Sequence, residues 1–386
     1  MYQNPNPSST PDPTSNPNPN PNPSGSGEGD QSRRHRKKLA QVHDLARRLA
    51  ASDAAGRVEA AREVRRLARS SAKARSAFAV AAVVEPLVAM LPSHDPDARE
   101  SALLALLNLA VRNERNKDTV IKSGALPHLV ELLRSETSSL RELATAAALT
   151  LSASPSNQLT IATSGAVPYL VKILISGSIQ GKVDAVTTLY NLSTCRDSSS
   201  LTLPVDAAEP LLTLLKDCKK YSKFAEKATS LLEILSETEE GRNSISDLDG
   251  GILTLVETVE DGSLLSTECA VGVLLSLCCS SPQKYKELIL KEGAIPGLLL
   301  LTVEGTEEAQ KRARKLLDLL RDQPSRRASE DLRIAAYDIA ARVDGPRKAA
   351  STAKRLLHDM IKRNMELTMA RMEHRAAPYT PKTLVT

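Results

Sequence analysis

One motif recurs along this chain of 386 residues at a nearly constant spacing. The sequence Gly-Ala-(Leu/Val/Ile)-Pro begins at Gly124, Gly165 and Gly293, and each copy leads into a run of aliphatic residues. Weaker copies keep the same phase, so that repeats start near residues 82, 124, 165, 206, 250 and 293. A unit of this size cannot bury its own apolar faces and must stack on its neighbours. The period therefore predicts a solenoid over residues 82–325.

Each repeat carries the signals for three helices. A short helix is expected to end at Gly124, because glycine accepts the left-handed conformation that closes a helix. Pro127 fits the first turn of the next helix, where its missing N–H costs nothing. Polar residues 135–139 form a turn before a longer third helix over residues 140–152. No stretch shows the sustained alternation of a strand, so the sequence predicts an all-α fold.

The repeat motif resembles a known family. Together with Asn-Leu near the end of the third helix, at Asn108 and Asn191, the Gly-Ala-x-Pro-x-Leu-Val pattern is similar to armadillo repeats over about residues 43–325. Residues 270–322 also resemble the last repeats of plant U-box armadillo ubiquitin ligases, through the sequence that leads from Leu288 into Pro296 and Gly297. The resemblance implies a right-handed superhelical solenoid of about six to seven three-helix repeats. A U-box would carry a Cys-Pro-Ile signature and a tryptophan ahead of the repeats, and this sequence has neither.

Composition divides the chain into four parts. Residues 1–35, rich in Asn, Pro, Ser and Gly, are predicted to be a disordered tail. Residues 36–81 read as basic helices with a capping partial repeat, 82–325 as the armadillo repeats, and 326–386 as a basic linker, an amphipathic helix and a tail. Residues 76–325 carry a net charge of −8, against +10 for 31–75 and +6 for 326–386. The acidic middle is either a set of solvated helix faces or a surface that favours basic partners.

Several function classes find no support in the sequence. Aromatic residues make up 2% of the chain, which suits closely packed helices better than a ring-stacking pocket. The five cysteines lack a Cys-x-x-Cys pair, and the histidines lack metal-ligand spacing. We therefore expect no catalytic residue, no cofactor, no metal and no nucleic-acid partner. The sequence shows no secretory signal and no apolar run that could span a bilayer, so we expect the protein in the cytoplasm, the nucleus or both. We also expect it to be mostly monomeric.

The third helices carry the predicted binding residues, since in armadillo proteins they line the concave groove. Asn108 marks a position whose amide can clamp the backbone of an extended peptide. Its equivalents along the repeats are Thr150, Asn191, Ile234, Ser276 and Asp318. Four residues earlier, where nuclear-import arrays place tryptophan shelves, stand Leu104, Ala146, Thr187, Ser230, Gly272 and Arg314. An import-type carrier is therefore disfavoured.

A row of acidic residues lies near the start of the third helices. Its members are Glu100, Glu142, Asp184, Glu226 and Glu268. A negative charge at a helix N-terminus stabilises it by ~0.3–1 kcal/mol, which is one interpretation of the row. The other is an acidic surface that faces a basic peptide. The predicted groove set is Glu100, Leu104, Asn108, Glu142, Thr150, Asp184, Thr187, Asn191, Glu226, Glu268, Ser276 and Arg314.

The basic flanks carry further candidates. A targeting or anionic-surface role is one interpretation of Arg33, Arg34, Arg36, Lys37 and Lys38, although such clusters also occur at ordinary helix junctions. Ser329 follows a pair of arginines as in a basophilic-kinase site. The segment 348–375 has an apolar stripe flanked by basic residues, typical of an amphipathic helix. Capping of the last repeat is the favoured role, ahead of docking on a partner helix; contact with a membrane surface is the least favoured.

Taken together, the sequence predicts a non-enzymatic adaptor or scaffold. It is expected to bind an extended or helical segment of another protein, possibly a basic one, in the concave groove. The alternative is a substrate-recruiting component of ubiquitin ligation that acts with a separate U-box partner.

Overall fold

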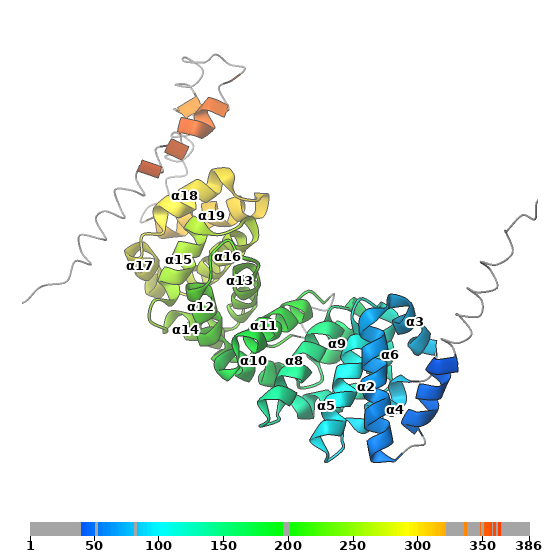
Figure 1. Ribbon diagram of the computed structural model, residues 1–386. Helices are drawn as coiled ribbons and strands as arrows, with labels where there is room; N and C mark the ends of the chain where they lie inside the picture. Colours follow the sequence, from blue (N-terminus) through cyan, green and yellow to red (C-terminus); the bar gives the residue numbers. More distant parts are fainter. Residues whose placement is uncertain are drawn as a thin grey trace, which may run out of the picture.

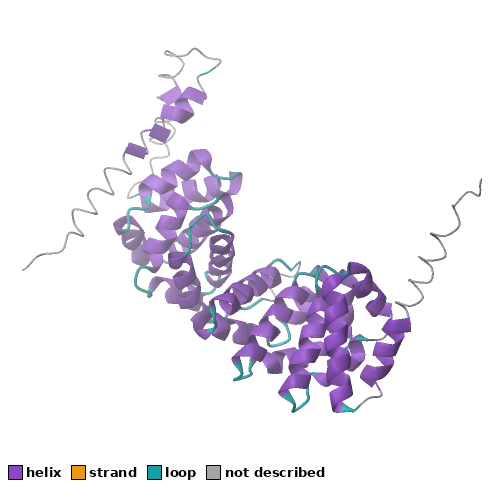
Figure 2. Ribbon diagram, viewed as in Figure 1, coloured by secondary structure: helices purple, strands orange, loops and turns teal. Residues whose placement is uncertain are grey.

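The chain folds into helices joined by short loops. The computed structural model describes residues 40–50, 53–80, 83–195 and 201–321, with short pieces at 336–337, 348, 351–356, 358–359 and 362–363. Figure 2 shows helices and loops, and no strand, over this described part. The prediction of an all-α solenoid is confirmed. Residues 1–35, the cluster from Arg33 to Lys38, and Ser329 lie outside the described residues.

The helices fall into three sets that alternate along the chain. The first helices are α3 (Ala72–Val80), α6 (Glu114–Lys122), α9 (Pro155–Ala162), α14 (Glu239–Ser246) and α17 (Pro282–Lys291). The second helices are α4 (Val84–Met90), α7 (Ala125–Leu133), α10 (Val167–Ser176), α12 (Ala208–Asp217), α15 (Gly251–Asp261) and α18 (Ile295–Glu304). The third helices are α2 (Ala54–Ser70), α5 (Pro96–Ala110), α8 (Ser138–Ser152), α11 (Ile179–Ser193), α13 (Lys223–Leu235), α16 (Leu264–Ser280) and α19 (Glu307–Leu320). A short 3₁₀ turn, η2 (Val205–Ala207), precedes α12.

Left-handed glycines separate the first helix from the second. Gly124, Gly165, Gly250 and Gly293 have φ of 82°, 84°, 71° and 80°. Only glycine adopts this conformation without a steric penalty, which is why the motif keeps it. These glycines coincide with four of the six predicted repeat starts.

Successive repeats stack through their third helices. Each third helix packs on the next, from α2 on α5 to α16 on α19. Figure 1 shows the array running from α2, α3 and α4 at one end to α18 and α19 at the other, with a change of direction between α11 and α12. The core is a continuous band of Leu, Val and Ala, in which Phe78 is the largest fully buried side chain. Small aliphatic side chains let the helices approach closely, so the array needs few aromatic residues.

The first turn of a first helix contacts the end of the preceding third helix. Asn116 of α6 is fully buried, and its Nδ2 donates to the carbonyl oxygens of Leu109 (2.8 Å) and Arg75 (3.0 Å). Asn157 of α9 donates in the same way to Leu151 O at 3.3 Å. The bond to Leu109 satisfies a carbonyl that the end of α5 leaves without a partner in its own helix. Neither asparagine is among the site residues predicted from the sequence.

At the corresponding place in α14 stands Gly241. A Cβ built on Gly241 would lie 1.9 Å from the carbonyl oxygen of Leu235 at the end of α13. The backbone of α14 therefore approaches α13 directly, where the two asparagine repeats use a side chain to bridge the gap.

Some described helices are strongly apolar. None of them alone is long and apolar enough to cross a bilayer, and α9 and α10 reach that length only as a pair bent by 87°.

Part of the C-terminal amphipathic segment is described and lies beside the last repeat. Residues 351–356 are helical, with Ala353 only 7% exposed. The Nδ1 of His358 lies 2.9 Å from Oε1 of Glu304, at the end of α18. This contact fits the capping interpretation, although the apolar stripe beyond residue 363 lies outside the described residues.

Glu260 of α15 is a half-buried acid between two stacked second helices. A Cβ on Gly297 of α18 would come within 2.8 Å of its Cγ, so the two helices meet at this side chain. Burial, with the negative charges of Asp261 and Glu257, raises the pKa of Glu260 from 4.5 to about 7.

This raised pKa predicts a loss of stability as pH rises. Between about pH 4.5 and 7 the folded chain keeps the proton on Glu260 that the unfolded chain has released, so the free energy of unfolding falls across this window. Glu260→Gln should raise the thermal midpoint at pH 8 by about 2 °C and leave it unchanged at pH 4. Glu131→Gln, at an exposed site on α7, is the control. Equal effects of Glu260→Gln at both pH values would contradict the assignment.

Candidate partner-binding face

The row of third helices presents one continuous face, here called the third-helix face. It carries the predicted groove residues on α5, α8, α11, α13 and α16. The acidic row lies along it, but the structure divides that row into two groups.

Glu100 and Glu142 are exposed on α5 and α8. Neither forms an ion pair with another described residue. Glu142 lies beside the start of α11, where a Cβ on Gly181 would be 4.0 Å from its Cγ. These two carboxylates are available to a partner.

Glu226 and Glu268 instead join successive repeats. The hydroxyl of Ser263, the N-cap of α16, donates to Oε1 of Glu226 at 2.9 Å. The hydroxyl of Thr306, the N-cap of α19, donates to Glu268 in the same way. Burial favours a raised pKa for Glu226, but hydrogen bonds from Lys223 and Ser263 outweigh it and lower the pKa. Glu226 and Glu268 therefore each accept a hydrogen bond from the N-cap residue of the next third helix.

Asp184 is the most enclosed member of the row, with 8% of its surface exposed. Gln180 donates to its Oδ1 at 2.7 Å. Burial raises the pKa of Asp184, and the charge of Glu142 adds to that effect. A carboxylate in this position stabilises its own repeat and offers little surface to a ligand.

The amide and hydroxyl positions also differ from one another. The Nδ2 of Asn191 donates to Ser152 Oγ at 3.1 Å, and the hydroxyl of Ser276 donates to Ser236 O at 2.8 Å, so both connect neighbouring third helices. Asn108 donates only within its own helix, to Leu104 O at 2.8 Å, and is part-exposed. Among these polar positions Asn108 is therefore the best placed to contact a partner backbone.

Arg314 lies away from this set. Its Nη2 lies 3.3 Å from the carbonyl of Thr302 on α18 and 3.0 Å from Oε1 of Gln310. The guanidinium is thus turned toward the second helix of its own repeat, and Arg312 reaches across the third-helix face in its place.

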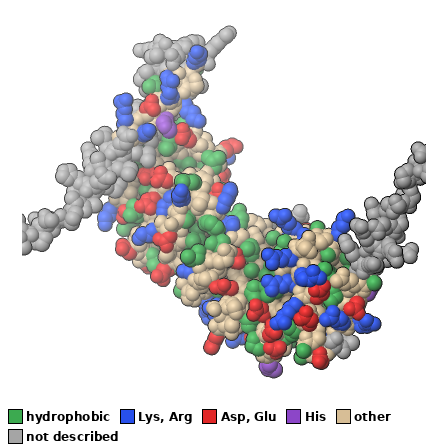
Figure 3. Space-filling view, in the orientation of Figure 1, with side chains coloured by type: hydrophobic (Ala, Val, Ile, Leu, Met, Phe, Trp, Pro, Cys, Tyr) green, Lys and Arg blue, Asp and Glu red, His purple; other side chains and the backbone are tan. Residues whose placement is uncertain are grey.

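Lys227 is a cation that sequence reasoning missed. Its Nζ donates to the hydroxyl of Thr187 at 2.8 Å, across from α13 to α11. Burial lowers the pKa of Lys227, while Glu226 opposes the shift. The third-helix face is therefore acidic at α5 and α8 and mixed in charge beyond α11. In Figure 3 basic side chains also gather over the end of the array formed by α2 and α3.

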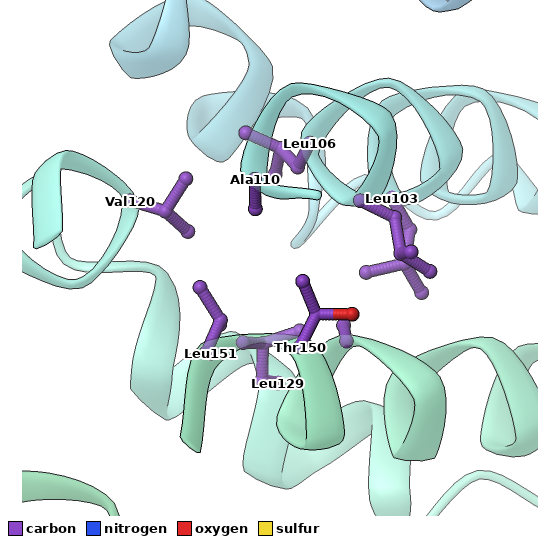
Figure 4. Close-up of a pocket in the computed structure, with 9 residues that line it drawn as sticks. Leu103, Leu106, Ala110, Val120, Leu129, Thr150 and Leu151 are labelled. Atoms are coloured by element: carbon purple, nitrogen blue, oxygen red, sulfur yellow. The ribbon is translucent and has the colours of Figure 1, made fainter. Parts of the chain in front are cut away.

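Two spaces lie between helices of the described part of the chain. One apolar cavity of about 10 Å³ lies between α5, α6, α7 and α8. Figure 4 shows the side chains of Leu106, Ala110, Val120, Leu129, Thr150 and Leu151 around it. This volume is about that of a single water, and its lining offers almost no polar partner. An open depression of about 270 Å³ lies between α10, α11 and α12. No cluster of metal-ligating side chains occurs among the described residues.

Comparison with known proteins identifies the repeat. The family model described as "Plant U-box protein ARM repeat region" matches residues 41–331. This chain belongs to that family. The ARM repeat fold is generally a binding scaffold rather than a catalytic one.

The relatives of this ARM repeat chain are longer than it is. U-box domain-containing protein 17 of Arabidopsis thaliana is 32% identical over 317 residues, which cover 81% of this chain and 42% of that protein. U-box domain-containing protein 45 of the same species is 31% identical over 265 residues, covering 67% and 34%. The chain thus spans less than half the length of either relative. The crystal structure of an engineered protein aligns with a TM-score of 0.57 at 24% identity, over 81% of this chain and 77% of that one, and supports the fold alone.

Proposed function

We propose that this ARM repeat chain is an adaptor that binds a segment of another protein along the third-helix face. The observation that carries the proposal is the pair Glu100 and Glu142, which are exposed on successive third helices and form no ion pair with another described residue. Asn108 lies on the same face with its amide part-exposed. Carboxylates and an amide in this arrangement suit a basic segment whose backbone the asparagine holds. We place the protein in the cytoplasm, the nucleus or both, as a mostly monomeric protein.

The first test reverses the two exposed charges. Glu100→Arg with Glu142→Arg should weaken capture of basic partner segments by at least about tenfold, because like charges then face each other across the interface. The thermal midpoint should stay within about 2 °C of wild type, since neither carboxylate joins two repeats. The measurement is a pull-down from native extract read by mass spectrometry, followed by titration of the recovered partner.

A matched control uses acids on the second helices. Glu131→Arg with Glu209→Arg makes the same charge change at exposed positions on α7 and α12. If both double variants lose the same partners, net charge rather than the third-helix face governs binding. If neither loses them, the acidic pair is not the binding site.

A second candidate function is substrate recruitment for ubiquitin ligation. Its support is membership of the plant U-box ARM repeat family. The discriminating experiment adds this chain to charging and conjugating enzymes, with and without a separate U-box protein. Ubiquitination of a captured partner that requires both proteins supports recruitment, and no stimulation by this chain excludes it.

A further inference from the structure

An ion pair crosses the third-helix face between repeats that are not adjacent. The Nη1 of Arg312, on α19, lies 2.5 Å from Oε1 of Glu233, on α13. The helix α16 lies between these two helices in the stack, packed against both. The pair therefore spans three successive third helices.

The crossing depends on Gly272 in the middle of α16. A Cβ on Gly272 would lie 2.5 Å from both Arg312 Nη1 and Glu233 Oε1. The pair thus occupies the place above Gly272 where any other residue would put its side chain. A glycine inside a helix lowers the stability of the helix by about 1 kcal/mol relative to alanine. At Gly272 the missing side chain leaves the space that the ion pair occupies.

Oxygen acceptors from three helices surround the guanidinium of Arg312. Besides Glu233, its Nη1 donates to the main-chain oxygen of Glu268 at 3.1 Å, and its Nε donates to Oε1 of Glu308 at 3.2 Å. The side chains of Arg312 and Glu233 are 24% and 28% exposed. Burial opposes the charge on Arg312, but Glu233 and Glu308 raise its pKa above the usual value. A planar cation with several N–H donors matches this geometry better than an ammonium group.

We propose that Glu233, the main-chain oxygen of Glu268 and the open floor at Gly272 form a guanidinium-binding subsite of the third-helix face. Arg312 fills the subsite in the free protein. An arginine side chain of a partner segment takes its place when that segment extends over the last repeats. The built-in occupant has a high effective concentration, so a partner displaces it only when other contacts, such as those at Glu100 and Glu142, already hold the segment. The identity of the competing segment rests on the proposed function, whereas the subsite itself does not.

Chemical rescue tests the subsite without a partner. In Arg312→Ala, ethylguanidinium at about 50 mM should raise the thermal midpoint by about 2 °C, because a ligand that binds only the folded state stabilises it. Wild type, whose subsite is filled, should not respond. Lys315→Ala, an exposed site on the same helix, is the matched control. Ethylammonium should give a smaller rise than ethylguanidinium. Equal shifts in all three proteins, or no shift in Arg312→Ala, would overturn the proposal.

Competition is tested with a labelled arginine-rich peptide, measured by fluorescence anisotropy. Arg312→Ala should bind it about tenfold more tightly than wild type, and Lys315→Ala should not. Glu233→Gln in the Arg312→Ala background should abolish the gain. A gain of the same size in Lys315→Ala, or a gain that persists without Glu233, would contradict displacement at this subsite.

Gly272→Ala gives an independent variant that keeps every charge. Its methyl group should expel Arg312 and also close the floor of the subsite to a partner arginine, so Gly272→Ala should not show the tighter peptide binding of Arg312→Ala. A gain of about tenfold in Gly272→Ala would count against the proposal. The two hypotheses fail separately. Rescue of Arg312→Ala together with an unaffected Glu100→Arg/Glu142→Arg variant rejects the adaptor face and keeps the subsite. Loss of binding in that double variant without rescue rejects the subsite alone.

Discussion

Replacement of Gly241 by alanine should lower the free energy of unfolding by about 2–4 kcal/mol. The added Cβ would lie 1.9 Å from Leu235 O and 2.8 Å from its carbonyl carbon, and both are main-chain atoms that cannot rotate away. To relieve this clash, α14 would have to move away from the end of α13, which would open the packing between these two helices. Urea unfolding followed by circular dichroism measures the change.

Gly181 provides the matched control for this prediction. It follows Ser178, the N-cap of α11, at the same spacing with which Gly241 follows Thr238, the N-cap of α14. A Cβ on Gly181 would meet side-chain atoms of Ile173 and Ser178 at 3.4 Å, an ordinary contact. Gly181→Ala should therefore be neutral or stabilising by up to about 1 kcal/mol, through helix propensity alone. Equal losses in both variants would show that the clash at Leu235 is not the cause.

The fold could be predicted because its determinants are local. A left-handed glycine, a proline in the next turn and an aliphatic run each act over a few residues, so Gly124 and Gly165 mark helix boundaries in the sequence itself. The repeat period then fixes the stacking, because no single unit can bury its own apolar face.

The division of the acidic row could not be predicted, because it depends on the next repeat. Glu226 and Glu268 accept hydrogen bonds from Ser263 and Thr306, which lie about 40 residues further along the chain. The structure gives Glu100 no such bond, although its place in the pattern is the same. A carboxylate near the start of a third helix is thus either exposed or hydrogen-bonded to the next repeat. The sequence of a single repeat does not show which of the two applies.

The Glu233–Arg312 pair was missed for a related reason. Its members lie 79 residues apart and meet only because Gly272 between them lacks a side chain. Counting from Asn108 selects Arg314 on α19, whereas the guanidinium that reaches α13 belongs to Arg312. Charge pairs across several repeats depend on side-chain length and helix rotation, which the repeat period does not encode.

Asn116→Ala is expected to have the second large effect on stability. Asn116 is fully enclosed, and its Nδ2 donates to carbonyl oxygens of Leu109 and Arg75, on α5 and α3. Alanine would leave Leu109 O, at the end of α5, buried without this donor and would also remove the bond to Arg75 O, at a cost of about 2–3 kcal/mol. The free energy of unfolding from urea titration is the measurement.

Asn108→Ala tests whether an asparagine on the third-helix face contributes to partner binding, in contrast to the structural role of Asn116. Asn108 donates only to Leu104 O, a carbonyl of its own helix, and the amide is part-exposed. Since alanine is the better helix former, stability should change by less than about 0.7 kcal/mol. Partner affinity should fall about tenfold if this amide holds the partner backbone. Asn116→Ala should keep partner affinity wherever it remains folded, because its side chain is out of reach. A large loss of stability in Asn108→Ala with unchanged affinity would reverse the two roles and remove Asn108 from the binding face.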